Sequence, residues 1–311
     1  MMRSSWRLVA PLVAVAALVF GGSAGRAAAD EPTPYSYLAG LAAQLNGPGQ
    51  PPPGANDWSC RPSAAHPHPV VLLHGLSNDT ITWRTMSPVL AKAGYCVFST
   101  TYGAGPLGPA LGAIAPVPDS AGQIAAFIDR VRAATGAEKV DLVGHSMGGA
   151  VPFYYLNHLG GVPSIGKYIA LAASFHGSTV SGTQEPLLAV ADSLGVRDRI
   201  VAQCGPCQLS PGDPFLSVLN PDPRIAPAID FTTVVSRYDE IATPYTTGLL
   251  DAAPNVRNIV LQDLCPTDYT EHYELTSDPI TVRTVLNALD PAHAEPVTCE
   301  TVLPFVGAPA H

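Results

Sequence analysis

The sequence predicts an α/β protein built on a mostly parallel, doubly wound sheet with helices on both faces. Short, uninterrupted runs of hydrophobic residues, such as 70–73, are typical of strands that a parallel sheet buries on both faces. These runs alternate with segments of helical spacing, which is the order expected of a parallel sheet covered by helices. The roughly 280 residues that follow an expected leader are enough for one large domain with a well-buried core.

The elements follow one another in a regular order. Segment 120–135 shows helical spacing at Ile124, Ile128 and Val131, and Gly136 supplies a stop. The same reasoning predicts strands at 70–73, 95–101, 140–143, 168–173, 231–236 and 256–261, and helices at 83–94, 120–135, 150–159 and 279–289.

Residues 177–228 interrupt this alternation. They are rich in Pro, Gly and Ser and carry apolar residues such as Leu188, Val190 and Leu194. An insertion of this kind can form a lid, the wall of an acyl pocket, or packing over the sheet, and all three remain open. We therefore expect one domain at 57–311 that contains this insertion.

The N-terminal 29 residues have the pattern of a signal peptide. Arg3 and Arg7 precede an apolar stretch at 8–20, and Ala27 to Ala29 form a small-residue cleavage site. The apolar stretch is short for a bilayer span, so we expect no stable membrane span, although an uncleaved anchor is the alternative. The mature protein is expected to be secreted and to begin with an N-terminal segment and Pro/Gly-rich connector at 30–56.

Composition argues against nucleic acid as a partner. Charged residues make up 13% of the chain and the net charge is −9, so no basic surface is apparent. The Cys and His spacings fit no zinc site, and no Asp-x-Asp-x-Asp-Gly loop is present. We expect no metal and no cofactor, while a structural calcium ion and the oligomeric state stay open.

Six cysteines in an exported chain favour disulfide bonds. About fifteen connectivities are possible, and pairing of sequence neighbours is the simplest. That choice gives Cys60–Cys96, Cys204–Cys207 and Cys265–Cys299.

The segment Cys204-Gly205-Pro206-Cys207 has the letters of the thioredoxin redox motif. A redox site of that kind places its first cysteine at a helix N-terminus after a strand. Residues 196–203 are helical in pattern instead, so a structural loop is the favoured interpretation and a redox site the alternative.

The most informative segment is Gly144-His145-Ser146-Met147-Gly148, which follows the apolar run at 140–143 and precedes the expected helix at 150–159. A serine between glycines at a strand-to-helix turn is typical of the nucleophile elbow of α/β-hydrolases. The turn is tight, so the glycines avoid clashes and the serine hydroxyl projects outward. Ser146 is therefore the expected nucleophile.

A serine nucleophile needs a base, and the base needs a carboxylate that orients it. In this fold the chain order is serine, acid, histidine, with each group after a strand. His272 lies between the last expected strand and helix, whereas His293 and His311 come later. Asp239 follows the strand at 231–236, with Glu240 and Asp263 as fallbacks; Asp263 and Asp268 are otherwise expected to be solvated loop carboxylates.

The oxyanion hole requires two backbone N–H groups. Met147 follows the nucleophile, and Leu76 follows the first strand, so these two are the expected donors. His74 and His145 are expected to be structural, and His176 to be a buried structural residue or a boundary of the acyl pocket.

These segments carry a family resemblance. Residues 53–60, 69–75, 94–98, 144–148 and 236–240 resemble the secreted actinobacterial triacylglycerol lipases of the class 2 lipase family, and the likeness spans most of 50–290. It implies an α/β-hydrolase fold, a triad of Ser146, Asp239 and His272, and an oxyanion hole at Leu76 and Met147. One departure is Leu76, where such enzymes also carry a small or β-branched residue, and it affects the shape of the pocket more than the mechanism.

The favoured function is that of a serine carboxylic-ester hydrolase, a lipase or esterase. Its partner is a lipid ester of the acylglycerol type, met in solution or at a lipid–water interface. An acyltransferase that uses the same acyl-enzyme is the alternative, and a non-catalytic α/β-hydrolase scaffold used for binding is a further one.

Overall fold

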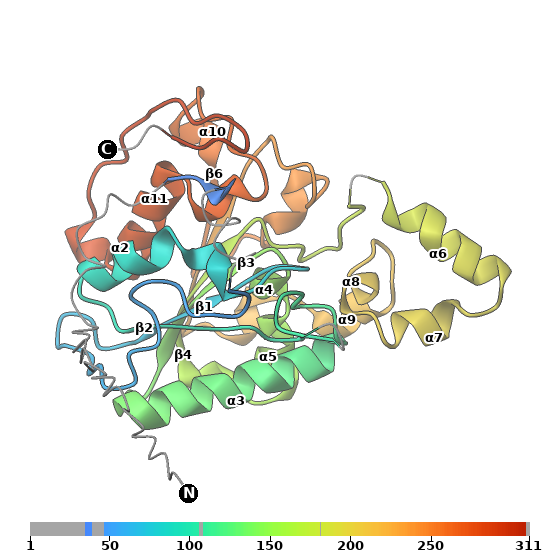
Figure 1. The fold of residues 1–311 in the computed structure, drawn as a ribbon, viewed down its shortest axis with the longest axis horizontal. Helices are drawn as coiled ribbons and strands as arrows, with labels where there is room; N and C mark the ends of the chain where they lie inside the picture. Colours follow the sequence, from blue (N-terminus) through green and yellow to red (C-terminus); the bar gives the residue numbers. More distant parts are fainter. Residues whose placement is uncertain (1–34, 39–46, 106–107, 181, 309–311) are drawn as a thin grey trace, which may run out of the picture. The chain divides into compact units, whose positions relative to one another are not determined.

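The computed structural model describes residues 35–38, 47–105, 108–180 and 182–308, which all belong to one unit, Pro32–His311. The expected signal peptide lies outside these residues. The described strands form one six-stranded sheet of order β2-β1-β3-β4-β5-β6 in which every neighbouring pair is parallel (Figure 1). Their bounds are β1 Val70–Leu73, β2 Val97–Thr100, β3 Val140–His145, β4 Ile165–Leu171, β5 Asp230–Val235 and β6 Val256–Val260.

The α-helices of the described chain separate consecutive strands except β5 and β6, and the last two follow β6. They are α2 Met86–Lys92, α3 Val117–Thr135, α4 Met147–Ala150, α5 Pro152–His158, α6 Gln184–Ser193, α7 Arg197–Val201, α8 Gly205–Gln208, α9 Phe215–Leu219, α10 Leu261–Leu264 and α11 Pro279–Leu289. Short 3₁₀ turns occur at η1 Thr80–Trp83, η2 Val162–Ser164, η3 Pro223–Ile225, η4 Tyr245–Gly248, η5 Glu274–Thr276 and η6 Pro291–His293.

Most boundaries agree with the predictions, and the differences have local causes. Helix α3 ends where Gly136 adopts the left-handed conformation (φ 76°), as expected. The expected helix at 150–159 corresponds to α5, which begins only at Pro152 after a break from α4, because Pro152 has no N–H to continue the helical ladder. Strand β4 ends at Leu171, two residues early, since Ala172 has a φ of 47°.

The two faces of the sheet bury separate hydrophobic clusters. Val71 and Leu73 of β1 point to the face covered by α3 and α5, while Val70 and Leu72 point to the face covered by α2 and α11 (Figure 1). All four side chains are fully buried. This explains why the strand reads as a continuous apolar run rather than an alternating one.

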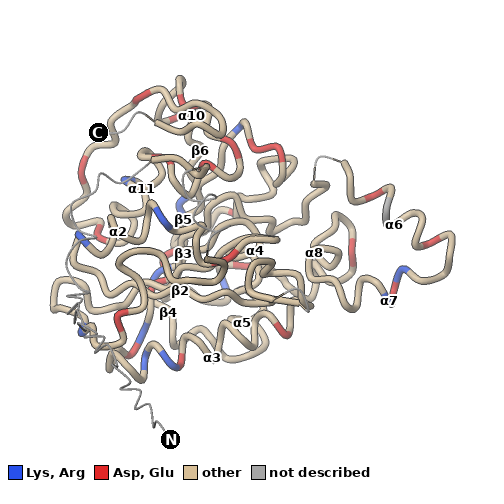
Figure 2. Tube along the Cα trace, viewed as in Figure 1, with Lys and Arg blue, Asp and Glu red and all other residues tan. Residues whose placement is uncertain are grey.

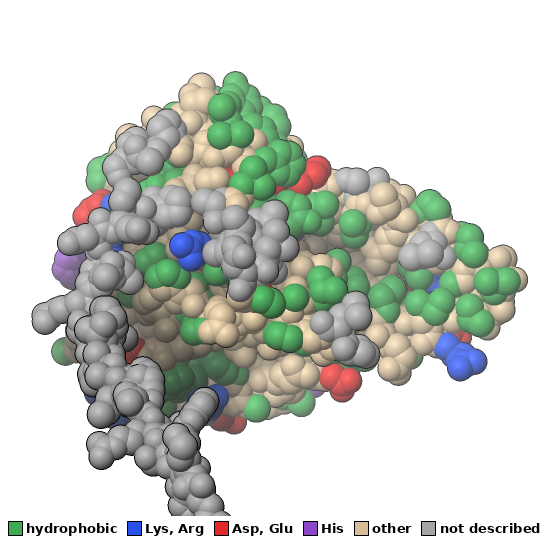
Figure 3. Space-filling model, in the orientation of Figure 1, with side chains coloured by type: hydrophobic (Ala, Val, Ile, Leu, Met, Phe, Trp, Pro, Cys, Tyr) green, Lys and Arg blue, Asp and Glu red, His purple; other side chains and the backbone are tan. Residues whose placement is uncertain are grey.

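Residues 177–228 contain α6 to α9. On α6, Leu188 and Ala191 are buried, whereas Val190 and Leu194 are exposed. Figure 3 shows hydrophobic side chains on the surface of this segment, and Figure 2 shows Lys and Arg spread over several elements with Asp and Glu among them. In the described part of the chain, no helix combines the length and hydrophobicity that a membrane span needs.

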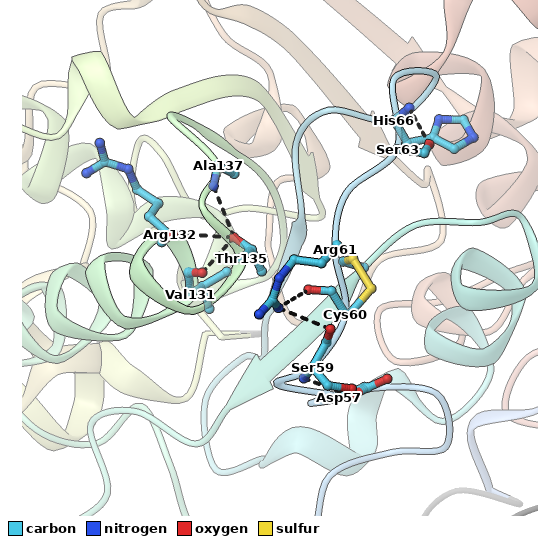
Figure 4. The surroundings of a disulfide bond; sticks show 11 residues. Asp57, Ser59, Cys60, Arg61, Ser63, His66, Val131, Arg132, Thr135 and Ala137 are labelled. Carbon is cyan, nitrogen blue, oxygen red and sulfur yellow. Dashed lines mark hydrogen bonds between the residues drawn. A yellow bond between two sulfur atoms is a disulfide. The ribbon is translucent and has the colours of Figure 1, made fainter.

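Three disulfides join sequence neighbours, as expected: Cys60–Cys96, Cys204–Cys207 and Cys265–Cys299. Cys60 lies in a loop whose Arg61 guanidinium donates to the backbone carbonyls of Ser59 and Cys60 (Figure 4). The Cys204–Cys207 pair does not follow a strand. Cys204 comes after α7 and precedes the four-residue α8, which supports the structural interpretation of this loop.

Candidate functional site

Ser146 lies at the turn between β3 and α4, at the carboxyl end of the sheet. Its backbone has a φ of 54° and a ψ of −123°, a combination that residues other than glycine rarely adopt. The Ser146 N–H donates to the Leu171 carbonyl oxygen at 2.8 Å, which ties the turn to β4. The residue is only 5% exposed, so most of it is shielded from bulk water.

The flanking glycines allow three backbone segments to come together. A Cβ added to Gly144 would lie 2.1 Å from the carbonyl oxygen of Gly148, and one added to Gly148 would lie 2.1 Å from that of Leu73. Both distances are far below van der Waals contact, so any side chain would force β1, β3 and α4 apart. The glycine spacing is therefore a steric requirement of this turn.

Asp239 and His272 meet after β5 and β6. The His272 Nδ1–H donates to Asp239 Oδ2 at 2.9 Å, and Oδ1 lies 3.0 Å from the same nitrogen. The His272 side chain is 3% exposed and the Asp239 side chain 1%, so this contact is shielded from water. The carboxylate is held in turn by the N–H groups of Ile241 at 2.9 Å and Ala242 at 2.7 Å. A fixed carboxylate sets the orientation and tautomer of the imidazole.

The other candidate groups lie elsewhere. Glu240 accepts the backbone N–H of His272 at 3.3 Å and so supports the loop rather than the imidazole. Asp263 is exposed and pairs with Arg237 at 2.7 Å. His293 is exposed and pairs with Asp290, while His311 lies outside the described residues.

Two expectations about single side chains were wrong. Asp268 is fully buried instead of solvated, with Oδ1 accepting the Thr270 N–H at 2.8 Å, because the 265–270 loop folds under the C-terminal segment at Val302. His176 is exposed instead of buried, and its Nε2–H donates to the Leu249 carbonyl oxygen at 3.0 Å. The packing of loops that are distant in sequence determines how exposed each of these two side chains is, and neither residue type nor spacing predicts that packing.

Sequence reasoning missed Gln262, whose side chain joins the loop after β5, which carries Asp239, to the loop after β6, which carries His272. The Gln262 side chain accepts the Arg237 N–H at 2.8 Å and donates to Ser236 Oγ and the Asp268 carbonyl oxygen, each at 3.0 Å. Ser236 Oγ also donates to the Thr270 carbonyl oxygen. The only available signal was the position of Gln262 directly after the last strand.

Two cavities meet at Ser146. The larger one, of about 100 Å³, is lined by Ser146 and His272, and the smaller one, of about 30 Å³, is lined by Ser146 and Met147. Leu76, Val180 and Ile241 line both. The expected nucleophile and base thus face one space, and both expected oxyanion donors border the other.

Met147 and Leu76 carry the expected oxyanion donors. Met147 is the first residue of α4, and the first N–H groups of a helix have no partner within the helix. Leu76 follows β1 by three residues, and its neighbour Gly75 lies so close that an added Cβ would be 2.8 Å from Ser146 Cβ. The β1 loop therefore passes directly beside the serine.

Two buried histidines, His145 and His74, hydrogen-bond the backbone of residues that line the site. The His145 Nε2–H donates to the His272 carbonyl oxygen at 2.8 Å, and its Nδ1 has no hydrogen-bond partner among the described residues. Burial, with a smaller contribution from nearby His272, lowers the pKa of His145 well below its usual value. Burial likewise lowers the pKa of His74 to about 4, and the His74 Nδ1–H donates to the Gly75 carbonyl oxygen. Both rings are neutral at pH 7, which supports the structural roles expected for them.

A set of buried carboxyl groups lies next to His272 in the chain, at residues 271–278. Burial raises the pKa of Glu271 to about 7, of Glu274 to about 8 and of Asp278 to about 7. Within the described ranges, no three His, Cys, Asp or Glu side chains are grouped as a metal ion would require. These carboxyl groups bind backbone N–H groups instead, including those of Tyr37, Tyr273 and Ile280.

Comparison with known proteins agrees with this architecture. The family model described as alpha/beta hydrolase fold matches residues 68–219, which include Leu76, Ser146 and the first four strands. Together with the parallel sheet and its helices, this match shows that the chain has the α/β-hydrolase fold.

Several solved structures share the fold. Lipase B of Aspergillus fumigatus matches with a TM-score of 0.58 and 18% identity over 80% of this chain and 57% of that one, so this chain spans little more than half its length. The mature lipase BlEst2 of Bacillus licheniformis matches with a TM-score of 0.52 and 18% identity over 78% and 96%. A structure from the metagenome-derived lipolytic enzymes LipS and LipT matches with a TM-score of 0.51 and 16% identity over 78% and 100%.

Proposed function

We propose that this chain is a secreted serine carboxylic-ester hydrolase that cleaves lipid esters of the acylglycerol type through an acyl-enzyme on Ser146. The observation that carries the proposal is the shared cavity of Ser146 and His272, with the His272 imidazole held by Asp239 at 2.9 Å. A hydroxyl, a base and an orienting carboxylate are the groups that nucleophilic acyl transfer needs.

In the acylation step, His272 Nε2 accepts the proton of the Ser146 hydroxyl while Oγ attacks the ester carbonyl carbon. The carbonyl oxygen becomes an oxyanion that accepts hydrogen bonds from the Leu76 and Met147 N–H groups. The tetrahedral intermediate collapses when the His272 imidazolium gives its proton to the leaving alkoxide. The products are the free alcohol and an ester between the acyl group and Ser146 Oγ.

Deacylation repeats the same steps with water. His272 accepts a proton from the water molecule, hydroxide attacks the acyl carbon, and the proton returns to Ser146 Oγ as the carboxylic acid leaves. Throughout, the Asp239 carboxylate stabilises the imidazolium that forms at each step. Its hydrogen bonds to the Ile241 and Ala242 N–H groups and to His272 Nδ1 keep the carboxylate in place.

Three further observations support the finer parts of the proposal. The solved structures that share the fold include proteins named as lipases, which favours lipid esters, as does the class 2 lipase resemblance. Three disulfides are typical of an oxidising compartment and favour secretion, in agreement with the signal-peptide pattern at 1–29. The domain at 57–311 would then carry the site, with 177–228 as part of its substrate pocket.

The first test replaces the nucleophile. Ser146→Ala should lower kcat on p-nitrophenyl esters by roughly five to six orders of magnitude and abolish labelling by a fluorophosphonate, because the alanine methyl group cannot form the acyl-enzyme. Ser193→Ala is the matched control, since its hydroxyl is exposed on α6. Retained activity in Ser146→Ala with an unchanged melting temperature would refute the proposal.

The same assay distinguishes transfer from hydrolysis. With glycerol present, the fraction of acyl groups recovered as free acid rather than as new ester measures which acceptor takes the acyl group. A hydrolase releases mostly free acid, whereas predominant ester formation would identify an acyltransferase.

A further inference from the structure

The smaller cavity beside Ser146 is bordered by the insertion. Besides Leu76 and Met147, its lining includes Gln184 at the start of α6 and Pro206 and Leu209 around α8. The Gln184 Nε2 donates to the Pro206 carbonyl oxygen at 2.8 Å, so these two parts of the insertion are joined. The volume of this cavity, about 30 Å³, is less than a third of the roughly 100 Å³ of the cavity that His272 lines.

The wall formed by α8 is held rigidly. The Cys204–Cys207 disulfide closes the loop, and the Gly205 N–H donates to the Ile114 carbonyl oxygen at 2.9 Å. A Cβ on Gly205 would lie 2.2 Å from the Ala115 carbonyl oxygen, which shows how closely α8 packs on 114–115. Gln208 fixes the other end by accepting the Val117 N–H at 2.8 Å. The half-buried Gln184 is thus the less constrained partner of the contact.

The chemistry assigns one substituent of the ester to each cavity. The leaving alkoxide must lie next to His272, from which it receives a proton, and His272 lines only the larger cavity. The oxyanion points to the Leu76 and Met147 N–H groups. The acyl chain, which leaves the tetrahedral carbon in the remaining direction, therefore enters the smaller cavity.

We propose that Gln184 and the Cys204–Cys207 loop close the acyl end of the site, so that the enzyme takes short-acyl esters and Gln184 sets the limit of chain length. This inference rests on the proposed ester hydrolase activity and adds the substrate class. It also gives the Cys-Gly-Pro-Cys segment a role: the disulfide holds Pro206 in place as the acceptor for Gln184.

The test is a chain-length series of p-nitrophenyl acetate, butyrate and octanoate on the full mature chain. Wild-type kcat/KM should be at least about tenfold lower for octanoate than for acetate. Gln184→Ala should raise the octanoate-to-acetate ratio of kcat/KM about tenfold or more, because the cavity then extends past Pro206. Gln184→Met, which keeps the length of the side chain, should stay near the wild-type ratio, as should Gln203→Ala, which changes an exposed glutamine of the same insertion.

Each outcome decides between clear alternatives. A wild-type preference for octanoate, or an unchanged ratio in a folded Gln184→Ala variant, would overturn the inference while leaving ester hydrolysis intact. If the wild type cleaves none of the three esters, the proposed function fails instead. Because the wild-type series alone can refute the inference, the test does not depend on the variants folding.

Discussion

Single residues of the site are distinguished by their surroundings more than by their type. Asp239 and Glu240 are adjacent carboxylates in one loop, yet only Asp239 faces the His272 imidazole. The reason is the turn after β5, in which the N–H groups of Ile241 and Ala242 bind Asp239 Oδ1 and direct the carboxylate inward. Glu240 is left to accept the backbone N–H of His272.

This difference leads to a prediction for Asp239→Asn. The neutral amide cannot stabilise the imidazolium and favours the wrong tautomer of His272, so kcat should fall roughly a thousand- to ten-thousandfold with little change in KM. Steady-state kinetics on a short p-nitrophenyl ester measure both constants. Asp263→Asn is the control, because Asp263 is exposed and pairs with Arg237 on the surface, and it should change kcat less than about twofold. A larger loss in Asp263→Asn than in Asp239→Asn would contradict the assignment.

At the scale of elements, the close approach of β1, β3 and α4 defines the position of Ser146. Gly148 lies in α4 against the Leu73 carbonyl oxygen, whereas Gly122 lies in α3 with no atom within 4 Å of an added Cβ. The two glycines are thus helical residues with opposite steric surroundings. The sequence pattern marks the first as part of the elbow but says nothing of the second.

Alanine substitutions at these two positions should act in opposite directions. Gly148→Ala should lower the free energy of unfolding by about 1–3 kcal/mol, since α4 must move away from β1. Gly122→Ala should raise it by about 0.5–1 kcal/mol, because alanine has the higher helix propensity. Denaturant unfolding measures both, and a Gly148→Ala variant as stable as wild type would mean that the elbow is less tightly packed than described.

For the molecule as a whole, the buried carboxyl groups near His272 link stability to pH. Glu274 accepts the Tyr37 N–H with both carboxyl oxygens, at 3.0 and 3.2 Å, and lies beside Gly307, so it joins the two ends of the described chain. Burial raises its pKa from 4.5 to about 8. The folded state therefore binds a proton that the unfolded state has released across this range, and stability decreases as pH rises.

The corresponding variant is Glu274→Gln, which is neutral at every pH. Between about pH 4.5 and about pH 8, the melting temperature of wild type should fall relative to that of the variant. The buried His74 and His145, whose pKa values are lowered, contribute the opposite slope equally in both proteins. A declining contribution should persist in the variant, because the pKa values of Glu271 and Asp278 are also raised by burial, to about 7. Glu185→Gln, on the exposed side of α6, serves as the control and should retain the wild-type slope. Equal slopes in Glu274→Gln and wild type would show that Glu274 is ionised in the folded protein.

The predictions from sequence were accurate where the responsible interactions are local. Strand β1 was located because burial on both faces requires a continuous apolar run, and the end of α3 because Gly136 tolerates a positive φ. They were wrong for Asp268 and His176, whose exposure depends on segments far away in the chain. Gln262 was missed because its three partners lie in two loops that only the folded sheet brings together.

The sequence by itself determined the α/β order of elements and the tight turn around Ser146. Each of these follows from interactions among residues close in the chain, or from a residue type that alone fits a backbone conformation. Only the tertiary structure decided which carboxylate meets His272 and where Gln184 and Pro206 close the cavity beside Ser146. The first contact joins the loops after β5 and β6, and the second joins two parts of the 177–228 insertion beside Leu76 and Met147. Their geometry depends on how the sheet and its helices pack.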